Sequence, residues 1–216
     1  YAARAARAEV VTIELDSEGI RPDALEAACR RHGAQVLCLT PSAQNPTAAR
    51  MSRERQADIL AIAQKYDLQI IEDECYSVSS SDQPTLRSMA PDRVWYTGSL
   101  SKSVSAALRF GYVVCPLGMG ETGRIAAQHN FFALALPLTL LVSELLQSGA
   151  AAEIRAKVQS EFDARLDMLV AHMGGFDLTW QSGIPFAWLR LPQGWRAYTF
   201  TRMAEEQGVL LRAADQ

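Results

Sequence analysis

The run Thr97-Gly98-Ser99-Leu100-Ser101-Lys102-Ser103 is the stretch that decides how this chain is interpreted. It follows the strand-like residues 93–97, and Arg109 comes shortly after it. A lysine amine can form a Schiff base, while serine hydroxyls and a guanidinium suit a phosphate group. A glycine such as Gly98 lets the backbone approach a bound group closely. Together these side chains indicate a site for pyridoxal phosphate (PLP), whose aldehyde bonds to a lysine.

Each of these residues also has an ordinary interpretation. A single lysine is usually a solvated surface charge, the serines could cap a turn, and Arg109 could form a surface ion pair. Residues 99–102 also match the S-x-x-K motif of penicillin-recognising enzymes. That motif needs K-T-G and S-D-N elements, which the sequence lacks, and it needs its serine and lysine on a helix. The hydrolase interpretation is therefore disfavoured.

Polar residues also follow two earlier strand-like runs. Asp73 follows residues 68–71, with Tyr76 close behind, and Asn45 lies in a turn-rich segment after residues 35–40. Because the carboxyl ends of parallel strands meet at one edge of a sheet, one site could gather Asn45, Asp73 and Lys102. A carboxylate beneath a pyridinium nitrogen keeps that nitrogen protonated. The alternative is that Asp73 and Asn45 are ordinary turn residues and that Tyr76 packs in a loop.

Strands that alternate with helices predict an α/β fold with a mostly parallel sheet and helical crossovers. One helix opens at Pro22 and ends at Gly33, and another runs from its cap, Ser52, to Tyr66. We expect the acidic triplet 72–74 to be a turn and residues 77–92 to be a loop. The expected strands are residues 35–40, 68–71, 93–97 and 110–115.

The second half of the sequence changes character. Helices are expected over residues 119–135 and 138–173, with breaks at Pro137 and near Ser148-Gly149. A strand, strand, helix, strand order follows, which predicts a smaller α+β domain. The expected division places a large PLP-binding domain at 1–160 and a small domain at 161–216. The four expected elements are residues 176–180, 185–191, 195–207 and 209–212.

Composition limits the class of protein. The 216 residues hold 21 Lys and Arg against 24 Asp and Glu, a net charge of −3. This segment lacks the basic excess of a nucleic-acid-binding surface, so no nucleic-acid contact is expected from it. The most apolar stretch, residues 130–146, contains Pro137 and Glu144, so no membrane span is expected.

The four cysteines form no C-x-x-C pair, and no histidine follows them at zinc-ligand spacing, so no metal site is expected. Cys38 and Cys115 lie in apolar strand-like runs, which favours buried free thiols. Free thiols fit a cytoplasmic location, although a widely spaced disulfide is the alternative.

Four motifs in order carry a resemblance to a known family. They are Gln44-Asn45-Pro46-Thr47, then Ile71-Glu72-Asp73 with Tyr76, then Gly98-Ser99-Leu100-Ser101-Lys102, then Leu108-Arg109-Phe110-Gly111-Tyr112. With these motifs the sequence resembles the class I/II aminotransferases of PLP fold type I, over essentially the whole chain. The resemblance implies a homodimer and a small-molecule amino acid or amine as effector or substrate.

The resemblance also implies a role for each site residue. Lys102 would carry the internal aldimine and move the proton, and Asp73 would pair with the pyridine nitrogen. Asn45 and Tyr76 would bond to the 3-oxygen of the cofactor. Ser99, Ser101 and Arg109 would hold its phosphate.

Finer features point to a subgroup. Residues 41–52 and 183–192 look like the aminotransferase-like domain of MocR-type transcriptional regulators in the GntR family. In those proteins a winged-helix DNA-binding domain precedes this one, and PLP serves sensing more than turnover. The leading hypothesis is a PLP-binding effector domain of such a regulator. The alternatives are a true aminotransferase, which moves an amino group from an amino acid to a 2-oxo acid, and a PLP-free interaction or dimerisation module.

The chain also departs from the family pattern. Ala48 replaces the glycine usual after Asn-Pro-Thr, Glu74-Cys75 replaces the more common Asp and a variable residue, and residues 105–107 replace Ala-Pro-Gly. The resemblance places the phosphate-binding glycine loop and the ring-stacking aromatic before Tyr1. It places the arginine that binds a substrate carboxylate after Gln216. We therefore expect this chain to be an internal piece of a longer protein.

Overall fold

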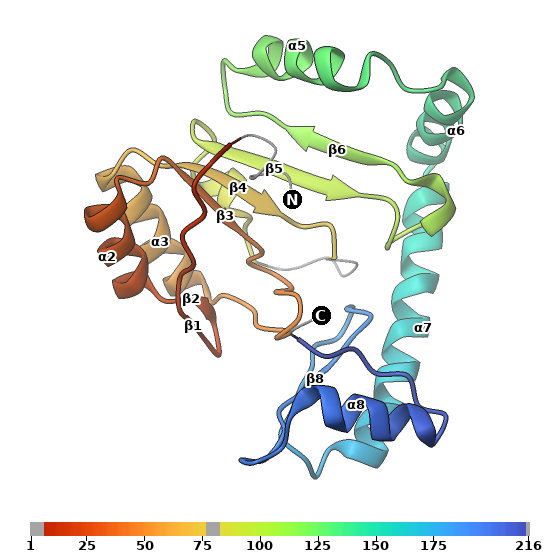
Figure 1. Ribbon diagram of the computed structural model, residues 1–216. Helices are drawn as coiled ribbons and strands as arrows, with labels where there is room; N and C mark the ends of the chain where they lie inside the picture. Colours follow the sequence, from red (N-terminus) through yellow and green to blue (C-terminus); the bar gives the residue numbers. More distant parts are fainter. Residues whose placement is uncertain (1–6, 77–82, 215–216) are drawn as a thin grey trace.

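The computed structural model describes residues 7–76 and 83–214. Helices and strands alternate through the first half of the chain, and helices dominate the second half (Figure 1). The elements are β1 (Leu15–Asp16), β2 (Gly19–Ile20), α2 (Pro22–His32), β3 (Val36–Leu39), α3 (Arg53–Lys65), β4 (Gln69–Asp73), α4 (Leu86–Met89), β5 (Val94–Ser99), the 3-10 helix η1 (Ala106–Leu108), β6 (Gly111–Val114), α5 (Gly120–Phe131), α6 (Leu136–Gln147), α7 (Ala150–Met173), β7 (Leu178–Thr179), β8 (Trp188–Leu189) and α8 (Ala197–Glu206).

A four-stranded sheet in the order β3-β4-β5-β6 forms the centre of the molecule. The β3–β4 and β4–β5 pairs are parallel, and β6 runs antiparallel to β5. The sheet is thus mostly parallel, as the sequence predicts. Consequently the carboxyl ends of β3, β4 and β5 lie at one edge, and the loops that leave them are neighbours.

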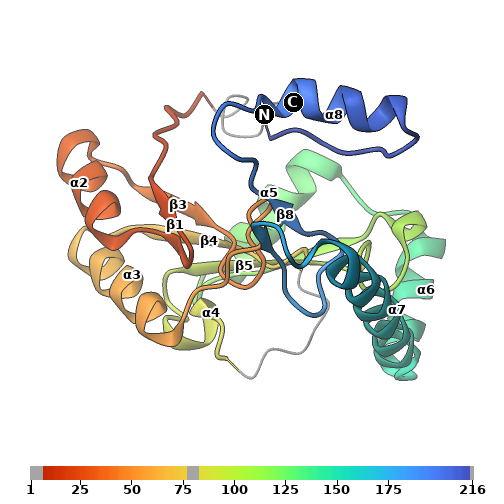
Figure 2. The ribbon, with the colours of Figure 1, turned by 90° about the horizontal axis from the view of Figure 1, so that it is seen from below.

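Helices α2 and α3 pack side by side against one face of this sheet (Figure 2). Their ends follow local chemistry: Pro22 opens α2, Gly33 ends it with φ of 61°, and the Ser52 hydroxyl accepts the Arg55 N–H at the start of α3. These two predicted helices are confirmed. Beneath them, fully buried apolar side chains form the core, including Ile59, Leu68, Ile70, Leu86 and Val94.

Side-chain alternation along β3 corrects one expectation. Leu37 and Leu39 point into the core, whereas Val36 and Cys38 are exposed on the opposite face. The predicted burial of the Cys38 thiol is therefore wrong, because its apolar run has only one face against α2 and α3. All four cysteines are free, and Cys115 is half-buried.

Two further expectations for the large sheet are corrected. The acidic triplet is not a turn as a whole, because β4 continues through Glu72 to Asp73. Of the expected loop 77–92, residues 77–82 lie outside the described residues, and the rest contains the short helix α4. The strand continues because Glu72 and Asp73 pair with Tyr96 and Thr97 of β5. Helix α4 starts at its cap, Thr85, and the fully buried Glu72 carboxylate accepts the N–H groups of Leu86 and Arg87, each at 2.8 Å, which fixes this start against β4.

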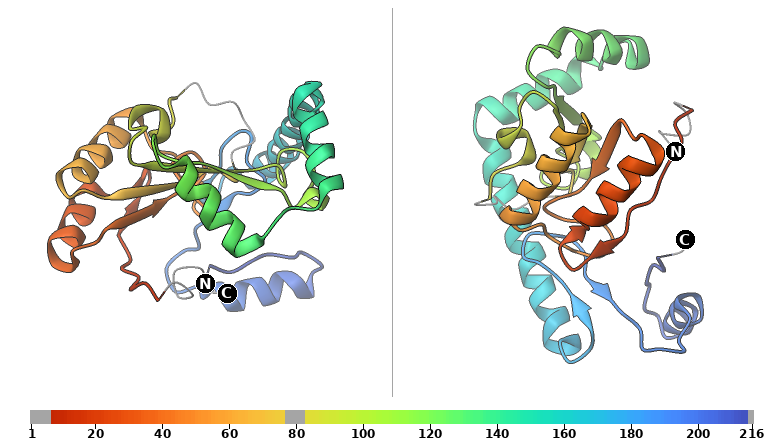
Figure 3. Two further views of the ribbon diagram at one scale, coloured as in Figure 1. Left: turned by 90° about the horizontal axis from the view of Figure 1, so that it is seen from above. Right: turned by 90° about the vertical axis from the view of Figure 1, so that its left-hand side faces the viewer.

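The second half of the chain extends away from the sheet along α7 (Figure 1). The predicted break near Ser148-Gly149 separates α6 from α7, and Pro137 lies in the first turn of α6 rather than interrupting a helix. Helix α5 approaches the residue just after β6, since a Cβ on Gly123 would collide with the Cys115 sulfur (Figure 3). Helix α7 passes without a break through residue 160, where the sequence places the domain division, and that division stays a prediction.

The last part of the chain contains the β7–β8 hairpin and α8. The expected strand 209–212 is wrong: no ladder partner is found for it among residues 7–76 and 83–214, and Leu210 is 82% exposed. An apolar run becomes a strand only where a neighbouring strand accepts its hydrogen bonds. Within the part of the chain that the structure describes, no helix has both the length and the hydrophobicity needed to span a membrane.

Candidate functional site

The loop after β5 is held by hydrogen bonds that centre on Ser99. The Ser99 hydroxyl donates to the carbonyl of Phe110 at 3.1 Å and accepts the backbone N–H of Ser101 at 3.1 Å. The Ser103 hydroxyl donates to the Ser99 carbonyl at 3.3 Å, and the buried Leu100 side chain anchors the loop. The sequence analysis predicted that the Ser99 hydroxyl binds the phosphate of PLP. In this structure it closes the loop instead, and it must rotate away from Phe110 to donate elsewhere.

Lys102 extends from this loop toward Tyr76, three residues after the end of β4. Its amine lies 5.4 Å from the centroid of the Tyr76 ring, which is a cation–π distance. The side chain is exposed, and none of the ion pairs between described residues involves Lys102. An amine that is not held by a carboxylate is available to attack an aldehyde.

Asp73 occupies the carboxyl end of β4, opposite Thr97 of β5 in the ladder. Its Oδ1 accepts the backbone N–H of Cys75 at 3.0 Å, which turns the chain out of the strand. Burial, with the neighbouring Asp73 carboxylate, raises the pKa of the Cys75 thiol to about 11. Cys75 therefore stays protonated near neutral pH.

The turn that carries Asn45 packs against Tyr76. Ala43 and Ala48 of the turn are buried together with Ile184, and Tyr76 and Phe186 cover this cluster. The rings of Tyr76 and Phe186 meet edge to face at 5.6 Å. The Asn45 side chain is exposed beside this cluster. The sequence predicted that Asn45, Tyr76 and Lys102 share a site, and the structure brings the turn, the phenol ring and the amine together.

Ser101 and Arg109 lie at the same end of the β5–β6 pair. Ser99 faces Gly111 in the antiparallel ladder, so the residues just after β5 and just before β6 are neighbours. Arg109 is exposed and has a left-handed backbone, with φ of 47°. No described residue forms an ion pair with its guanidinium. A hydroxyl and an unpaired guanidinium at one strand end suit a phosphate group.

Gly98 has a role that sequence reasoning did not identify. A Cβ at this position would lie 2.5 Å from the Tyr112 hydroxyl oxygen and 2.9 Å from its Cε1. The missing side chain thus admits the Tyr112 ring, which faces Gly98 across the ladder. The sequence assigned this glycine to close approach of a ligand, whereas the structure shows close approach of an aromatic ring.

Glu74 was also missed as a functional candidate. Its carboxyl is 6% exposed and accepts the backbone N–H of Ser42 at 3.3 Å. Burial raises the pKa of Glu74 to about 7; the Ser42 hydrogen bonds oppose this increase, and the carboxylates of Glu72 and Asp73 add to it. The available signal was the alternation of acidic residues in β4, which points Glu72 and Glu74 away from the face that carries Asp73.

The residues at this edge fit PLP by the chemistry of their side chains. They provide an unpaired amine, an unpaired guanidinium, hydroxyls, an amide, a phenol and a carboxylate. The amine matches an aldehyde, the guanidinium and hydroxyls match a phosphate, the amide and phenol match a ring oxygen, and the carboxylate matches a ring nitrogen. The donor set comes from the ends of β3, β4 and β5 and from the start of β6.

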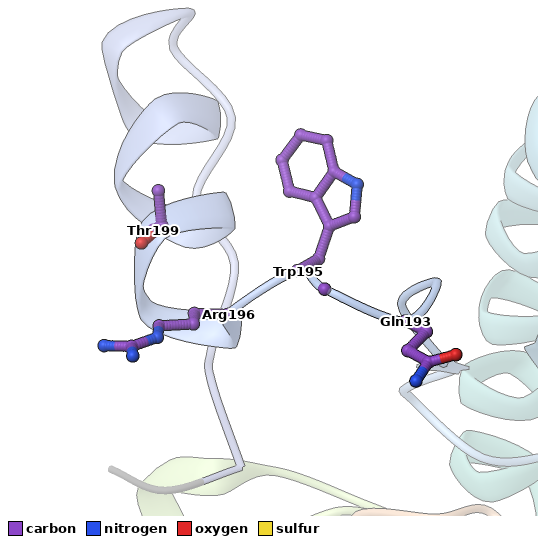
Figure 4. A pocket seen from close by; sticks show the side chains of 5 residues that line it. Gln193, Trp195, Arg196 and Thr199 are labelled. Carbon is purple, nitrogen blue, oxygen red and sulfur yellow. The ribbon is translucent and has the colours of Figure 1, made fainter.

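A separate hollow of about 470 Å³ lies in the C-terminal part of the chain (Figure 4). The residues that line it belong to the segment before α8 and to its first turn, and none of the predicted site residues is among them. Trp195 beside it is 50% exposed. Arg196 and Thr199 give this lining a guanidinium and a hydroxyl, but it has no lysine and no carboxylate, so the candidate site is the sheet edge. The lining residues are Gln193, Gly194, Trp195, Arg196 and Thr199.

Comparison with known proteins agrees with this geometry. The HTH-type transcriptional regulator YdeF of Bacillus subtilis is 31% identical over 96% of this chain and 45% of its own length. The mitochondrial kynurenine/alpha-aminoadipate aminotransferase of Bos taurus is 28% identical over 81% of this chain and 44% of its own length. This chain thus spans less than half the length of either relative.

Solved structures show the same fold. LysN, an alpha-aminoadipate aminotransferase from Thermus thermophilus, superposes with a TM-score of 0.82 at 26% identity, covering 94% of this chain and 55% of LysN. That structure was solved in complex with N-(5'-phosphopyridoxyl)-L-leucine. The fold is therefore that of the PLP fold type I aminotransferases. The family model described as aminotransferase class I and II matches residues 1–216, and this chain belongs to that family.

Proposed function

We propose that this chain is a PLP-binding, aminotransferase-like effector domain of a MocR-type transcriptional regulator of the GntR family. The observation that carries the proposal is the exposed Lys102 amine above the Tyr76 ring, in no ion pair with another described residue, in a chain of which 96% matches an HTH-type transcriptional regulator. A second regulator, YisV of Bacillus subtilis, is 28% identical over 78% of this chain and supports the same assignment.

The proposal gives each site residue a role toward the cofactor. When bound, PLP supplies an aldehyde for a lysine amine and a ring that withdraws electrons from the attached amino compound. Lys102 is the attachment point, and Asp73 keeps the ring nitrogen protonated. Asn45 and Tyr76 hydrogen-bond the 3-oxygen. Ser99, Ser101 and Arg109 hold the phosphate, with Ser99 also fixing the loop through Phe110.

The rest of the protein follows from the same proposal. A winged-helix domain would bind DNA, so this segment would contact a small-molecule amino acid or amine rather than nucleic acid. The protein would act as a homodimer in the cytoplasm. The net charge of −3 supports the lack of a nucleic-acid contact, and the four free thiols support the cytoplasmic location.

The second candidate function is catalytic transamination between an amino acid and a 2-oxo acid. It is favoured by the match to the bovine kynurenine/alpha-aminoadipate aminotransferase over most of this chain. Both candidates use the same lysine, and they differ in whether bound PLP exchanges amino groups repeatedly.

One set of measurements on the full-length gene product tests the proposal. We expect visible absorbance from lysine-bound PLP, fixation to Lys102 by borohydride as identified by peptide mass, and loss of both in Lys102→Ala. We also expect an amino compound to change the affinity of the protein for DNA from its own promoter. Retention of the borohydride-fixed adduct in Lys102→Ala would contradict the lysine assignment. Repeated turnover with a 2-oxo acid, without DNA binding, would favour the aminotransferase.

A further inference from the structure

The buried carboxyl of Glu74 joins the end of β4 to the turn that carries Asn45. Its Oε1 accepts the backbone N–H of Ser42 at 3.3 Å, from a residue 32 positions earlier in the chain. The backbone N–H of Glu74 donates to the carbonyl of Thr97 at 2.9 Å. The residue is therefore fixed to the sheet by its backbone and to the turn by its side chain.

The turn is closed by hydrogen bonds of its own. The Met51 N–H donates to the Pro41 carbonyl at 2.9 Å, and the Gln44 N–H donates to the Ala49 carbonyl at 3.0 Å. These bonds hold the turn in shape, but they do not attach it to β4. Ala43 and Ala48 pack the turn on Ile184 and Tyr76, and the contact between Ser42 and Glu74 adds a polar attachment to the end of β4.

We propose that Glu74 is a positioning residue of the cofactor site: its carboxyl holds the turn, and with it the Asn45 amide, against the carboxyl end of β4. The inference rests on the proposed function, because Asn45 is a cofactor contact only under that function. Glu74 acts through Ser42 and does not itself face the cofactor, since it points away from the side of β4 that carries Asp73.

The surroundings of Glu74 make this contact sensitive to protonation. The titratable groups around it are Glu72, Asp73 and Cys75 on its own segment and Tyr96 on β5. Ser42 of the turn is its uncharged partner. None of the described lysines or arginines forms an ion pair with it. Burial among carboxylates raises its pKa to about 7, so both forms are populated near neutral pH.

The two forms hold the turn differently. The ionised carboxylate accepts the Ser42 N–H as a charge-assisted hydrogen bond, whereas the protonated acid is a weaker acceptor. The hydrogen bond between Ser42 and Glu74 is therefore stronger when the pH lies above the pKa of Glu74, although burial of the ionised carboxylate lowers the stability of the folded protein as a whole. Under the proposed function, the Asn45 amide is best placed for the 3-oxygen when Glu74 is ionised, and PLP binding weakens as Glu74 becomes protonated.

The first test needs no cofactor and uses the full-length protein labelled with ¹⁵N. We expect the Ser42 amide resonance to titrate with an apparent pKa of about 7 in the wild type. The Asn45 side-chain amide should follow it. Glu74→Gln should abolish both titrations, whereas Glu205→Gln, at an exposed position on α8, should leave them unchanged. A pH-independent Ser42 resonance in the wild type, or the same titration in Glu74→Gln, would overturn the inference.

The second test measures PLP affinity as a function of pH. When the pH falls from about 8 to about 6, we expect the Kd of the wild type for PLP to rise by about three- to tenfold. This change corresponds to the loss of part of one charge-assisted hydrogen bond. Glu74→Gln should bind weakly with a flat profile. Glu74→Asp, whose carboxylate is one methylene further from Ser42, should bind weakly yet retain a pH dependence. A wild-type profile in Glu74→Gln would contradict the positioning role.

The two tests separate failure of the inference from failure of the proposed function. If the protein binds no PLP at Lys102, the proposed function is wrong, and the Ser42 titration still decides whether Glu74 holds the turn. If PLP binds at Lys102 but Ser42 does not titrate with Glu74, the proposed function stands and the positioning role is wrong.

Discussion

The aromatic ring of Tyr112 occupies the space that a side chain on Gly98 would need. The two residues face each other across the β5–β6 ladder, and a Cβ on Gly98 would lie 2.5 Å from the Tyr112 hydroxyl oxygen. The ring cannot remain in place if this glycine gains a side chain. With Tyr112 in this position, only glycine fits at position 98, directly before the lysine loop.

Gly98→Ala should destabilise the protein, because the tyrosine ring must move or the strands must separate. We expect the free energy of unfolding to fall by about 0.5–1.5 kcal/mol, the cost of moving the partly exposed Tyr112 ring out of its rotamer. Urea denaturation of the full-length protein measures the change. Combining Gly98→Ala with Tyr112→Ala should recover part of the loss, relative to the sum of the two single variants, since the clash is then absent. Strict additivity would argue against the contact.

Glu72→Ala should be among the most destabilising single changes at a carboxylate of this chain. Glu72 is fully buried and accepts the N–H groups of Leu86 and Arg87 at 2.8 Å each. Removal leaves these donors without partners, and we expect a loss of about 2–4 kcal/mol in the free energy of unfolding. Glu72→Gln keeps one acceptor oxygen and should lose less. Glu205→Ala, at an exposed position, serves as the control.

Asp67→Gly should stabilise the protein. Asp67 follows α3 with φ of 51°, and its side chain is 96% exposed and reaches Arg93 only at 3.8 Å. Glycine adopts this left-handed conformation without strain, so we expect a gain of about 0.5–1 kcal/mol. Thermal unfolding gives the measurement. Asp67→Ala keeps the strain and should give no gain; equal stability of the Ala and Gly variants would contradict the explanation.

The stability of the protein should also depend on pH through Glu74. Its pKa is raised from 4.5 to about 7 on folding, so the folded state binds the extra proton. The extra stability that the protonated Glu74 gives the folded state is fully present below the pKa of Glu74 in the unfolded chain. It is lost as the pH rises through the pKa of Glu74 in the folded protein. The full effect is on the order of 3 kcal/mol, since one pKa unit corresponds to about 1.4 kcal/mol.

The measurement is the difference between the wild type and Glu74→Gln in urea denaturation at a series of pH values. Subtraction removes the contribution of the other carboxyl groups. We expect the wild type to lose stability relative to Glu74→Gln from about pH 5 to about pH 8, in line with linkage between folding and protonation. A difference that does not change with pH would show that Glu74 has an ordinary pKa.

The sequence predicts well those parts of the fold that local chemistry determines. Pro22 and Gly33 bound α2, and Ser52 caps α3, because each of these residues acts on its immediate neighbours. Asp73 ends β4, and the segments that carry Asn45 and Lys102 follow β3 and β5. Strand order and parallel direction place these segments at one edge of the sheet, while a site shared by the three side chains stays a prediction.

Other features depend on contacts between distant residues, and the sequence does not reveal them. The first N–H groups of helix α4 donate to Glu72, which belongs to another element, β4. The exposure of Cys38 depends on which face of the sheet is covered. Residues 209–212 have a strand-like composition but no ladder partner in the described part of the chain. The contact of Glu74 with Ser42 likewise joins two segments that have no local relationship.

Tyr76 has two neighbours from distant parts of the chain. Lys102 lies over its ring, and Phe186, which belongs to the segment before β8, meets it edge to face. The polarity that the Lys102 amine experiences is thus set in part by a residue of the C-terminal region. A shortened protein that ended before Phe186 would keep the lysine loop and β5. It would lose the aromatic ring that packs against the Tyr76 phenol. The lysine site and the C-terminal region therefore have to be expressed together for the amine to keep its environment.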